Sequence, residues 1–467
     1  MNHDIKLPKK FTERMKEQLG EAAFGEFEKA FDNPIPVSLR LNPAKPTNKF
    51  DNEQPVPWCD LGKYLPKRPL FAKDPLIFAG AYYVQEASSM FLWHALKQHA
   101  PLTQDLRALD LCAAPGGKST LISTMLTEGS LLVTNELMPN RLPALTENIV
   151  RWGRANTFVS HNDSASFKPL KEFFDVIAVD APCSGEGMFR KDYKAVDMWS
   201  TGLVHSCSNT QKEILDDIMG CVKPGGLLLY STCTFAEAEN EESMRHIAAT
   251  GDFEPLKIEV PEAWGITELE TESHEGTCYG YRFIFHKTKG EGLFLSAFRK
   301  KGEPARNTKI KVPKKKAQQT NMLSKKEAEQ VGKWLKNPEE FDFAVKGTEH
   351  IFAIPKHATK DFKNLNTILK LTNPGVYMGK INAKSGKLIP THDLAVNTII
   401  SDKVPSFELD YEQAISYLRK QDFPLDTGSV KDWTIVKYEG VALGFIKVLP
   451  NRINNYYPMD LRLRKEF

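Results

Sequence analysis

Between residues 104 and 300, short apolar runs alternate with longer stretches in which apolar positions recur at helical spacing. This alternation is typical of a parallel β-sheet whose strands are joined by crossover helices. The expected strands cover residues 106–111, 131–135, 158–160, 174–180, 227–231 and 293–298. We therefore predict an α/β domain over residues 104–300. In such sheets, ligands bind beyond the carboxyl ends of the strands.

The first 103 residues follow a different pattern. Residues 11–31 have the spacing of a helix, and residues 37–42 alternate like a strand. In that strand Arg40 and Asn42 share one face and the leucines share the other, so the polar face meets either a polar partner or water. We predict a separate α+β domain over residues 1–103.

A segment without apolar periodicity divides the rest of the chain. Residues 301–323 include Pro304 and Pro313 and are expected to form an exposed basic linker. Helical spacing over residues 324–336 then begins a central α/β domain, predicted over 324–385. Short strand-like runs with Gly and Pro between them predict a β-rich module over 386–467, in which residues 433–447 resemble two strands joined by a turn.

The length and the cysteine content narrow the class of protein. A chain of 467 residues is long enough for roughly three domains of about 150 residues. No apolar run approaches the roughly 18 residues of a membrane span, and the start of the chain is strongly charged, so we expect a cytoplasmic protein without a membrane partner. The seven cysteines include no CxxC pair and no Cys/His ligand spacing, so we expect reduced thiols and no metal.

The net charge of +3 is small, but positive charge is concentrated in one place. Residues 300–316 carry eight basic residues and a single acid, Glu303. Such a segment is either a solvated linker or a site of phosphate contact, and by itself it favours neither reading.

A glycine loop follows the first predicted strand of the α/β domain, in the sequence Asp110-Leu111-Cys112-Ala113-Ala114-Pro115-Gly116-Gly117-Lys118. The two glycines let the backbone approach a ligand, and the helix that begins near Lys118 presents its amino end to negative charge. Because the spacing is not GxGxxG, a dinucleotide is disfavoured and S-adenosylmethionine is the better candidate.

Two acids follow the next two strands. Glu136 is placed to accept hydrogen bonds from a ribose diol, and Asp163 to accept one from the adenine amino group. Either acid alone would most simply be a surface carboxylate. Their common position after successive strands favours cofactor binding.

Two cysteines lie just beyond expected strand ends: Cys183 in Asp180-Ala181-Pro182-Cys183-Ser184-Gly185 and Cys233 in Tyr230-Ser231-Thr232-Cys233-Thr234. A thiolate that adds to carbon 6 of cytosine makes carbon 5 nucleophilic enough to accept a methyl group. Asp180 can contact the ring nitrogen or the exocyclic amine, and a raised pKa in a closed pocket would help it donate a proton. Either cysteine can supply the thiolate, whereas Cys59, Cys207, Cys221 and Cys278 are expected to be inert.

These motifs carry a family resemblance. The glycine loop, the segment from Asp180 through Glu186-Gly187, and Ser231-Thr232-Cys233-Thr234 with Glu239-Asn240-Glu241 resemble the motifs of the Nop/Sun family of RNA cytosine-5 methyltransferases. The match covers about residues 30–300, and the long carboxyl-terminal extension resembles the bacterial branch that modifies small-subunit ribosomal RNA. The resemblance implies a class I (Rossmann-like) S-adenosylmethionine-dependent methyltransferase core, an amino-terminal RNA-binding domain and a PUA-like module at the end.

The resemblance also separates the two thiols. It implies that Cys233 is the nucleophile and that Cys183 assists product release. Arg190 and Lys191 match a basic stretch that should approach the RNA. The cofactor contacts that the resemblance implies are Cys112, Ala113, Ala114, Pro115, Gly116, Gly117, Lys118, Glu136, Asp163 and Asp180.

A base inside a helix cannot present carbon 6 to a thiol, so the target cytosine must be unstacked or single-stranded. Arg40, Arg190, Lys191 and the basic segment are candidates for holding the flanking phosphates. The leading prediction is a monomeric enzyme that methylates carbon 5 of a cytosine in 16S rRNA, near the decoding region, in the rRNA or in the 30S subunit. The alternatives are a tRNA cytosine-5 methyltransferase and a non-catalytic RNA-binding ribosome assembly factor. The intact Cys233, Cys183 and Asp180 argue against the assembly factor.

Overall fold

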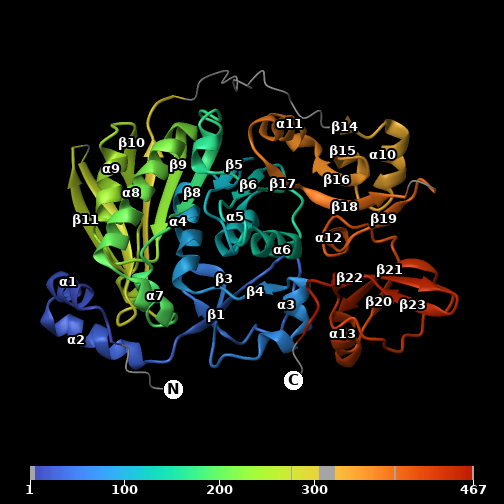
Figure 1. Ribbon diagram of the computed structural model, residues 1–467, viewed down its shortest axis with the longest axis horizontal. Coiled ribbons are helices and arrows are strands. Elements are labelled where there is room, and N and C mark those ends of the chain that lie inside the picture. Colours follow the sequence, from blue (N-terminus) through green and yellow to red (C-terminus); the bar gives the residue numbers. More distant parts are fainter. Residues whose placement is uncertain (1–5, 275, 304–320, 383–384, 465–467) are drawn as a thin grey trace.

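The six apolar runs of the α/β domain form strands of one sheet in the computed structural model (Figure 1). The structure describes residues 6–274, 276–303, 321–382 and 385–464. The predicted strands are β5 (Arg107–Asp110), β6 (Leu131–Asn135), β7 (Thr157–Ser160), β8 (Phe174–Asp180), β9 (Val222–Thr232) and β13 (Leu293–Lys300). Strands β5 to β9 pair in parallel, and β13 pairs antiparallel with β9. The sheet predicted from the sequence is confirmed.

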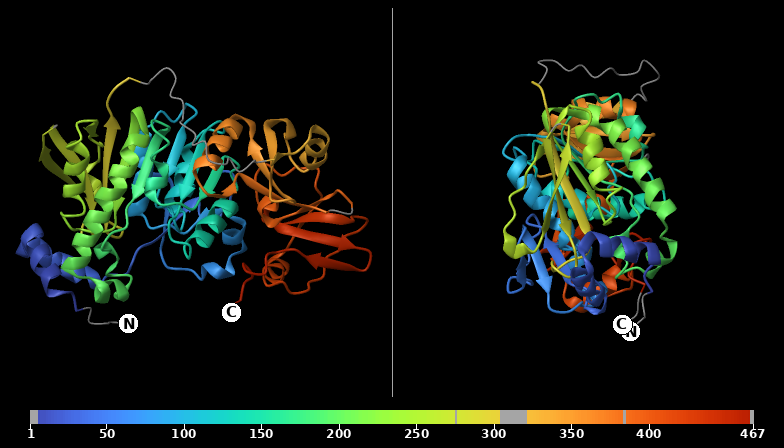
Figure 2. Two further views of the ribbon diagram at one scale, coloured as in Figure 1. Left: turned by 45° about the horizontal axis from the view of Figure 1, so that its top comes forward. Right: turned by 90° about the vertical axis from the view of Figure 1, so that its left-hand side faces the viewer.

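Both faces of this sheet are covered, which explains why its strands are apolar almost throughout. Successive residues of one strand, such as Val176 and Ile177, belong to different buried clusters. One cluster includes residues of α4 (Phe91–His99) and α5 (Gly117–Met125), and the other includes residues of α8 (Thr201–Ile218) and α9 (Glu241–Ala248). Figure 2 shows the helices in layers on the two sides of the sheet.

Four further strands complete the sheet and were not predicted. They are β10 (Phe253–Leu256), β11 (Thr267–Ser273), β12 (Gly276–Phe283) and β17 (Leu371–Pro374). Strand β11 has only one apolar residue, Leu269, and lies at the edge of the sheet, so it lacks the apolar pattern of a buried strand. Strand β17 comes from the predicted central domain and pairs with β7 at the opposite edge. The core therefore has the strand order β7-β6-β5-β8-β9-β13-β12, extended by β17 at one end and β11 at the other, while β10 pairs with β13 off this path.

The amino-terminal region contains two helices where one was predicted. Helix α1 (Lys9–Leu19) ends and α2 (Glu21–Lys29) begins at Gly20, whose φ of 78° no helix interior accommodates. The predicted strand is confirmed as β1 (Val37–Leu41), which joins β2 (Gln54–Val56), β3 (Cys59–Leu65) and β4 (Tyr82–Tyr83) in a sheet. Helix α3 (Pro75–Ala79) lies between β3 and β4 in the chain.

The carboxyl-terminal part forms two more sheets. The first contains β14 (Asn321–Met322), β15 (Phe341–Lys346), β16 (His350–Pro355), β18 (Val376–Ile381) and β19 (Leu388–Pro390), with α10 (Lys325–Gly332) and α11 (Thr359–Ile368). The second contains β20 (Ser406–Glu408), β21 (Asp432–Tyr438), β22 (Val441–Leu449) and β23 (Arg452–Asn455), with α13 (Tyr411–Leu418). The predicted pair of strands with a turn is β21 and β22. The first sheet runs to Pro390, past the expected start of the last module at residue 386.

No helix in the described ranges is long and apolar enough to cross a membrane. Most of the predicted basic linker, residues 304–320, lies outside the described residues.

Candidate active site

The two cysteines meet because their strands are neighbours in the sheet. Strands β8 and β9 pair in parallel with Asp180 opposite Ser231, so the loops that follow them leave the same edge side by side. The sulfur atoms of Cys183 and Cys233 lie 3.2 Å apart, and the Cys233 backbone N–H donates to the Cys183 sulfur at 3.4 Å. Two thiols that are 50 residues apart in the chain thus form one site.

The glycine loop forms the wall of a cleft of about 190 Å³ next to this pair. Gly116 has a φ of 111°, and a side chain there would press on Leu145 at 3.3 Å. Gly117 begins α5, and a Cβ at that position would point at Tyr83, 3.4 Å away. The cleft is lined by Tyr83, Val84, Gln85, Glu86, Ser89, Cys112, Ala113, Ala114, Pro115, Gly117, Lys118 and Asp180. Most of the predicted cofactor residues therefore line this one cleft. Residues 83–89 of the amino-terminal domain contribute to its lining as well.

The two acids predicted to hold the nucleoside differ in their surroundings. Glu136 is buried, and its carboxylate accepts from the backbone N–H groups of Ala114 (3.2 Å) and Met138 (2.8 Å), with Arg141 at 3.7 Å. Asp163 is exposed and accepts from the Ser166 N–H and hydroxyl, which lowers the pKa of Asp163. Neither acid lines the cleft. Glu136 shapes the glycine loop through Ala114, whereas Asp163 caps a short 3-10 helix.

Asp180 and Lys118 form an ion pair between the cleft and the thiols. Lys118 Nζ lies 2.8 Å from one carboxylate oxygen of Asp180, and the Ser231 hydroxyl donates to the other at 2.9 Å. Burial opposes the charge on Lys118, but Asp180, Asp110 and Cys233 favour it more strongly and raise the pKa of the ammonium. Asp180 is held here as a hydrogen-bond acceptor, and Lys118 supplies a positive charge that interacts with Cys233.

The environments of the cysteines differ. The hydrogen bond to Cys233, together with burial, raises the pKa of the Cys183 thiol well above its usual range. Cys183 therefore keeps its proton and can donate it toward the Cys233 sulfur. Burial also raises the pKa of Cys59 and of Cys207 to about 11, and that of Cys221 to about 12, which agrees with their expected inertness.

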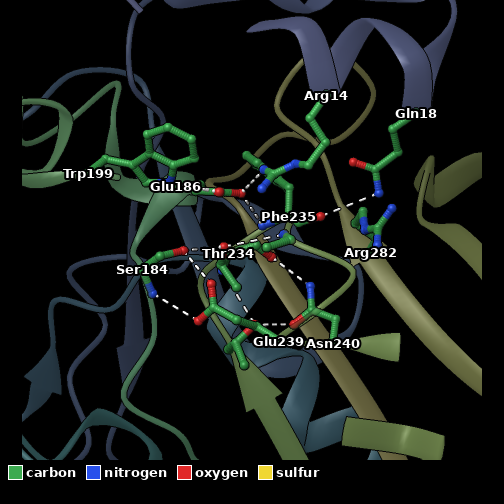
Figure 3. A network of polar contacts seen from close by, with 12 residues as sticks. Arg14, Gln18, Ser184, Glu186, Trp199, Thr234, Phe235, Glu239, Asn240 and Arg282 are labelled. Atoms are coloured by element: carbon green, nitrogen blue, oxygen red, sulfur yellow. Dashed lines mark hydrogen bonds and ion pairs between the residues drawn. The ribbon is translucent and has the colours of Figure 1, made fainter. Parts of the chain in front are cut away.

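Buried carboxylates for which the sequence predicted no function hold the two thiol loops together (Figure 3). Glu239 accepts from the Ser184 N–H at 3.0 Å, from the Ser184 hydroxyl and from Gln211 Nε2 at 2.9 Å. The Ser184 hydroxyl is also hydrogen bonded to the Thr234 hydroxyl at 2.8 Å. Glu239 thus connects the residue after Cys183 with the residue after Cys233. Its place in the Glu239-Asn240-Glu241 motif was the only signal for this function in the sequence.

Two of the predicted RNA contacts are wrong because their side chains are buried. Arg40 is 0% exposed, donates to Gln85 Oε1 at 2.8 Å and to Thr120, and lies over the Trp152 ring. Arg190 is 6% exposed and pairs with Glu291 at 2.8 Å. A buried guanidinium whose N–H groups already donate to acceptors of the protein does not reach a phosphate in solvent.

Both arginines instead join segments that are distant in the chain. Arg40 links β1 to α5, and Arg190 donates to the carbonyl oxygens of Ala30 and Gly290.

Lys191 is exposed, in agreement with its expected position. Asn42 is buried and donates to the carbonyl oxygens of Gly80 and Trp152. Among the described residues, no group of three or more His, Cys, Asp or Glu side chains is arranged to hold a metal ion.

Three family models match the chain. The model described as 16S rRNA methyltransferase RsmB/F matches residues 98–299, the amino-terminal domain of 16S rRNA methyltransferase RsmF matches 7–87, and the methyltransferase RsmF PUA domain matches 404–463. Among solved structures, a methyltransferase homologue from Pyrococcus horikoshii has a TM-score of 0.54 and 25% identity over 63% of this chain and 96% of its own. NSun6 from the same organism, solved with SFG, has a TM-score of 0.52 and 18% identity over 64% of this chain and all of its own, which shows the shared fold.

Curated relatives match over nearly the whole chain. Ribosomal RNA small subunit methyltransferase F of Aliivibrio fischeri (strain MJ11) is 31% identical over 99% of this chain and 98% of its own length. The protein of the same name from Vibrio campbellii is 29% identical over the same shares of the two chains. With the class I sheet, the amino-terminal domain and the PUA module all present, the chain belongs to the RsmF family of 16S rRNA methyltransferases.

Proposed function

We propose that this chain methylates carbon 5 of a cytosine in 16S rRNA, near the decoding region of the small subunit, through a transient bond between Cys233 and carbon 6. Family membership supports methylation of small-subunit rRNA. The observation that carries the cytosine-5 chemistry is the pair of thiols 3.2 Å apart beside the Lys118–Asp180 ion pair. Methylation of an exocyclic amine needs no such pair.

S-adenosylmethionine is the cofactor, and the residues present fit it. The cleft wall of residues 112–117 is formed by small side chains, and a Cβ at Gly117 would narrow the cleft against Tyr83. Helix α5 begins at Gly117 and offers its amino end to the carboxylate of a methionine group. When bound, the cofactor supplies an electrophilic methyl group.

The thiol chemistry divides between the two cysteines. Cys183 keeps its proton and Lys118 carries a positive charge, so negative charge is best accommodated on the Cys233 sulfur. The Cys233 thiolate adds to carbon 6, and the electron pair of the 5,6 double bond makes carbon 5 nucleophilic. Asp180 accepts a hydrogen bond from the exocyclic amine of the base, and Lys118 stabilises the negative charge that develops at the ring nitrogen.

Product release reverses the addition. The proton on carbon 5 passes to a water molecule, its electron pair re-forms the 5,6 double bond, and the carbon–sulfur bond to Cys233 breaks. Cys183 is close enough to exchange a proton with the departing sulfur. Its proposed function is therefore to free the enzyme from its product.

Bisulfite sequencing of rRNA and tRNA from cells with and without the gene tests the proposal. We expect protection of a cytosine in 16S rRNA to disappear with the gene, while tRNA protection is unchanged. Loss of a tRNA site would instead identify a tRNA methyltransferase. Full rescue of a growth defect by Cys233→Ala without any methylation would favour the assembly factor.

A further inference from the structure

The amino-terminal arm, residues 9–29, packs beside the thiol loops instead of on the sheet of its own domain. The Phe11 ring lies 5.0 Å from Phe189 and 5.9 Å from Trp199. The Phe27 ring stacks on Phe285 at 4.9 Å. Figure 1 shows α1 and α2 next to α7 (Tyr193–Met198), apart from β1 to β4. This apolar packing fixes the arm against the segments that follow Cys183 and Cys233.

Arg14 of this arm reaches a fully buried carboxylate. Glu186 is 0% exposed and accepts from Arg14 Nη2 at 2.6 Å, from Trp199 Nε1 at 2.8 Å and from the Phe235 N–H at 3.0 Å (Figure 3). Among the residues that the structure describes, Arg14 is the one cation within ion-pair distance of Glu186. If the cation is removed, the carboxylate becomes an unpaired buried charge, which is strongly unfavourable in that position.

Glu186 connects both thiol loops at once. It follows Cys183 by three residues, and its partner Phe235 follows Cys233 by two. The next residue, Gly187, donates its N–H to the Cys233 carbonyl oxygen at 2.8 Å. The backbone is packed so closely there that a Cβ on Gly187 would lie 2.7 Å from the Gly292 Cα. Because the neighbour of Glu186 is hydrogen bonded to Cys233 and closely packed, movement of Glu186 moves the backbone of Cys233.

We propose that Arg14 is a positioning residue for Cys233, acting through Glu186, so that the amino-terminal arm is part of the catalytic apparatus. This inference rests on the proposed function of Cys233 as the nucleophile. The thiolate must meet carbon 6 of a base that is held elsewhere, and a misplacement of about 1 Å can cost about 100-fold in rate.

Two other functions of Arg14 lead to different measurements. A direct RNA contact would affect the RNA concentration at half-saturation, because the Arg14 side chain is 29% exposed. A purely structural ion pair would change the melting temperature and leave the rate of the folded enzyme unchanged. A positioning residue lowers the single-turnover rate at saturating RNA and cofactor.

The test compares Arg14→Ala, Arg14→Lys and the matched control Lys9→Ala. Lys9 lies on the same helix, pairs with Glu13 and is 89% exposed. The measurement is single-turnover methylation of 16S rRNA from cells that lack the gene, with melting temperatures recorded for every variant. We expect Arg14→Ala to be about 10- to 100-fold slower at saturation, with half-saturating concentrations within about twofold of native. Arg14→Lys should be intermediate and Lys9→Ala native.

A native single-turnover rate for folded Arg14→Ala would overturn the inference, as would an effect confined to RNA affinity. If Arg14→Ala does not fold, Trp199→Phe decides. It removes a neutral donor from the same carboxylate and keeps an aromatic ring against Phe11. We expect it to be several-fold slower, and a native rate for both Trp199→Phe and Arg14→Lys would exclude the inference.

Adduct capture separates this inference from the proposed function. A Cys183→Ala enzyme with a native arm should accumulate a covalent complex with the RNA. If no complex forms, the proposed function fails, whatever Arg14 does. If the complex forms and Arg14→Ala in that background captures RNA at the same rate, only the function of Arg14 is wrong.

Discussion

The two sides of the site are held in place in different ways. On the cofactor side, one continuous segment makes both the strand β5 and the loop, and the left-handed Gly116 sets its turn. On the thiol side, two loops 50 residues apart are joined by Glu239 and Glu186, and the cation for Glu186 comes from residue 14. The cofactor wall therefore depends on local backbone geometry, whereas the thiol pair depends on buried polar contacts between distant segments.

The largest effect should come from the thiols themselves. Cys233→Ala removes the proposed nucleophile, so we expect methylation to fall at least about 1,000-fold and no covalent complex to form. Cys183→Ala should form the complex and stall, because the thiol beside the departing sulfur is lost. A denaturing gel of each variant with 16S rRNA and cofactor measures this. A stalled band from Cys233→Ala but not from Cys183→Ala would reverse the assignment.

A smaller loss is expected where the two sides meet. Lys118→Met removes the cation that pairs with Asp180 and favours negative charge on Cys233, and we expect the adduct to form about 100-fold more slowly. Lys223→Met is the control, since Lys223 pairs at 2.7 Å with Asp175, near the other end of β8. Equal losses for both variants would contradict the special position of Lys118.

The smallest effect concerns stability on the cofactor side. Burial raises the pKa of Asp110 to about 7. The folded protein therefore holds a proton that the unfolded chain releases near pH 4, so stability should fall as the pH rises from about 4 to 7. Asp110→Asn should remove this slope and stabilise the protein by on the order of 2 kcal/mol at pH 8. Urea unfolding at several pH values measures it, and an unchanged slope would mean that Asp110 is ionised when folded.

The sequence predicted the elements whose pattern is local. Six strands of the α/β domain were predicted correctly because a sheet buried on both faces requires continuous apolar runs, whereas β10, β11 and β12 of the same region were missed. The glycine loop and the thiols were placed correctly because parallel strands bring their carboxyl ends to one edge. Strand β17 was not predicted to belong to this sheet, since its partner β7 lies more than 200 residues earlier in the chain.

The errors concern charged residues, for which sequence alone does not give burial. Arg40 was expected to face RNA because it alternates with leucines, but the second face of β1 packs on α5. Arg190 was expected to approach RNA from its place in a basic stretch, and it is enclosed by Glu291 and Phe285. Lys191, next to it, is exposed. Periodicity tells which residues share a face, and only the tertiary structure tells what covers that face.

For this protein, the sequence by itself determined the order of the strands, the place of the glycine loop and which two cysteines lie at the sheet edge. Each of these depends on neighbouring residues and on the rule that parallel strands end at one edge. The tertiary structure alone decided how far the Cys183 thiol is buried, which acids line the cleft and which cations are buried. Those properties depend on distance and on exclusion of water, and residues far apart in the chain set them, such as Cys233 for the Cys183 thiol.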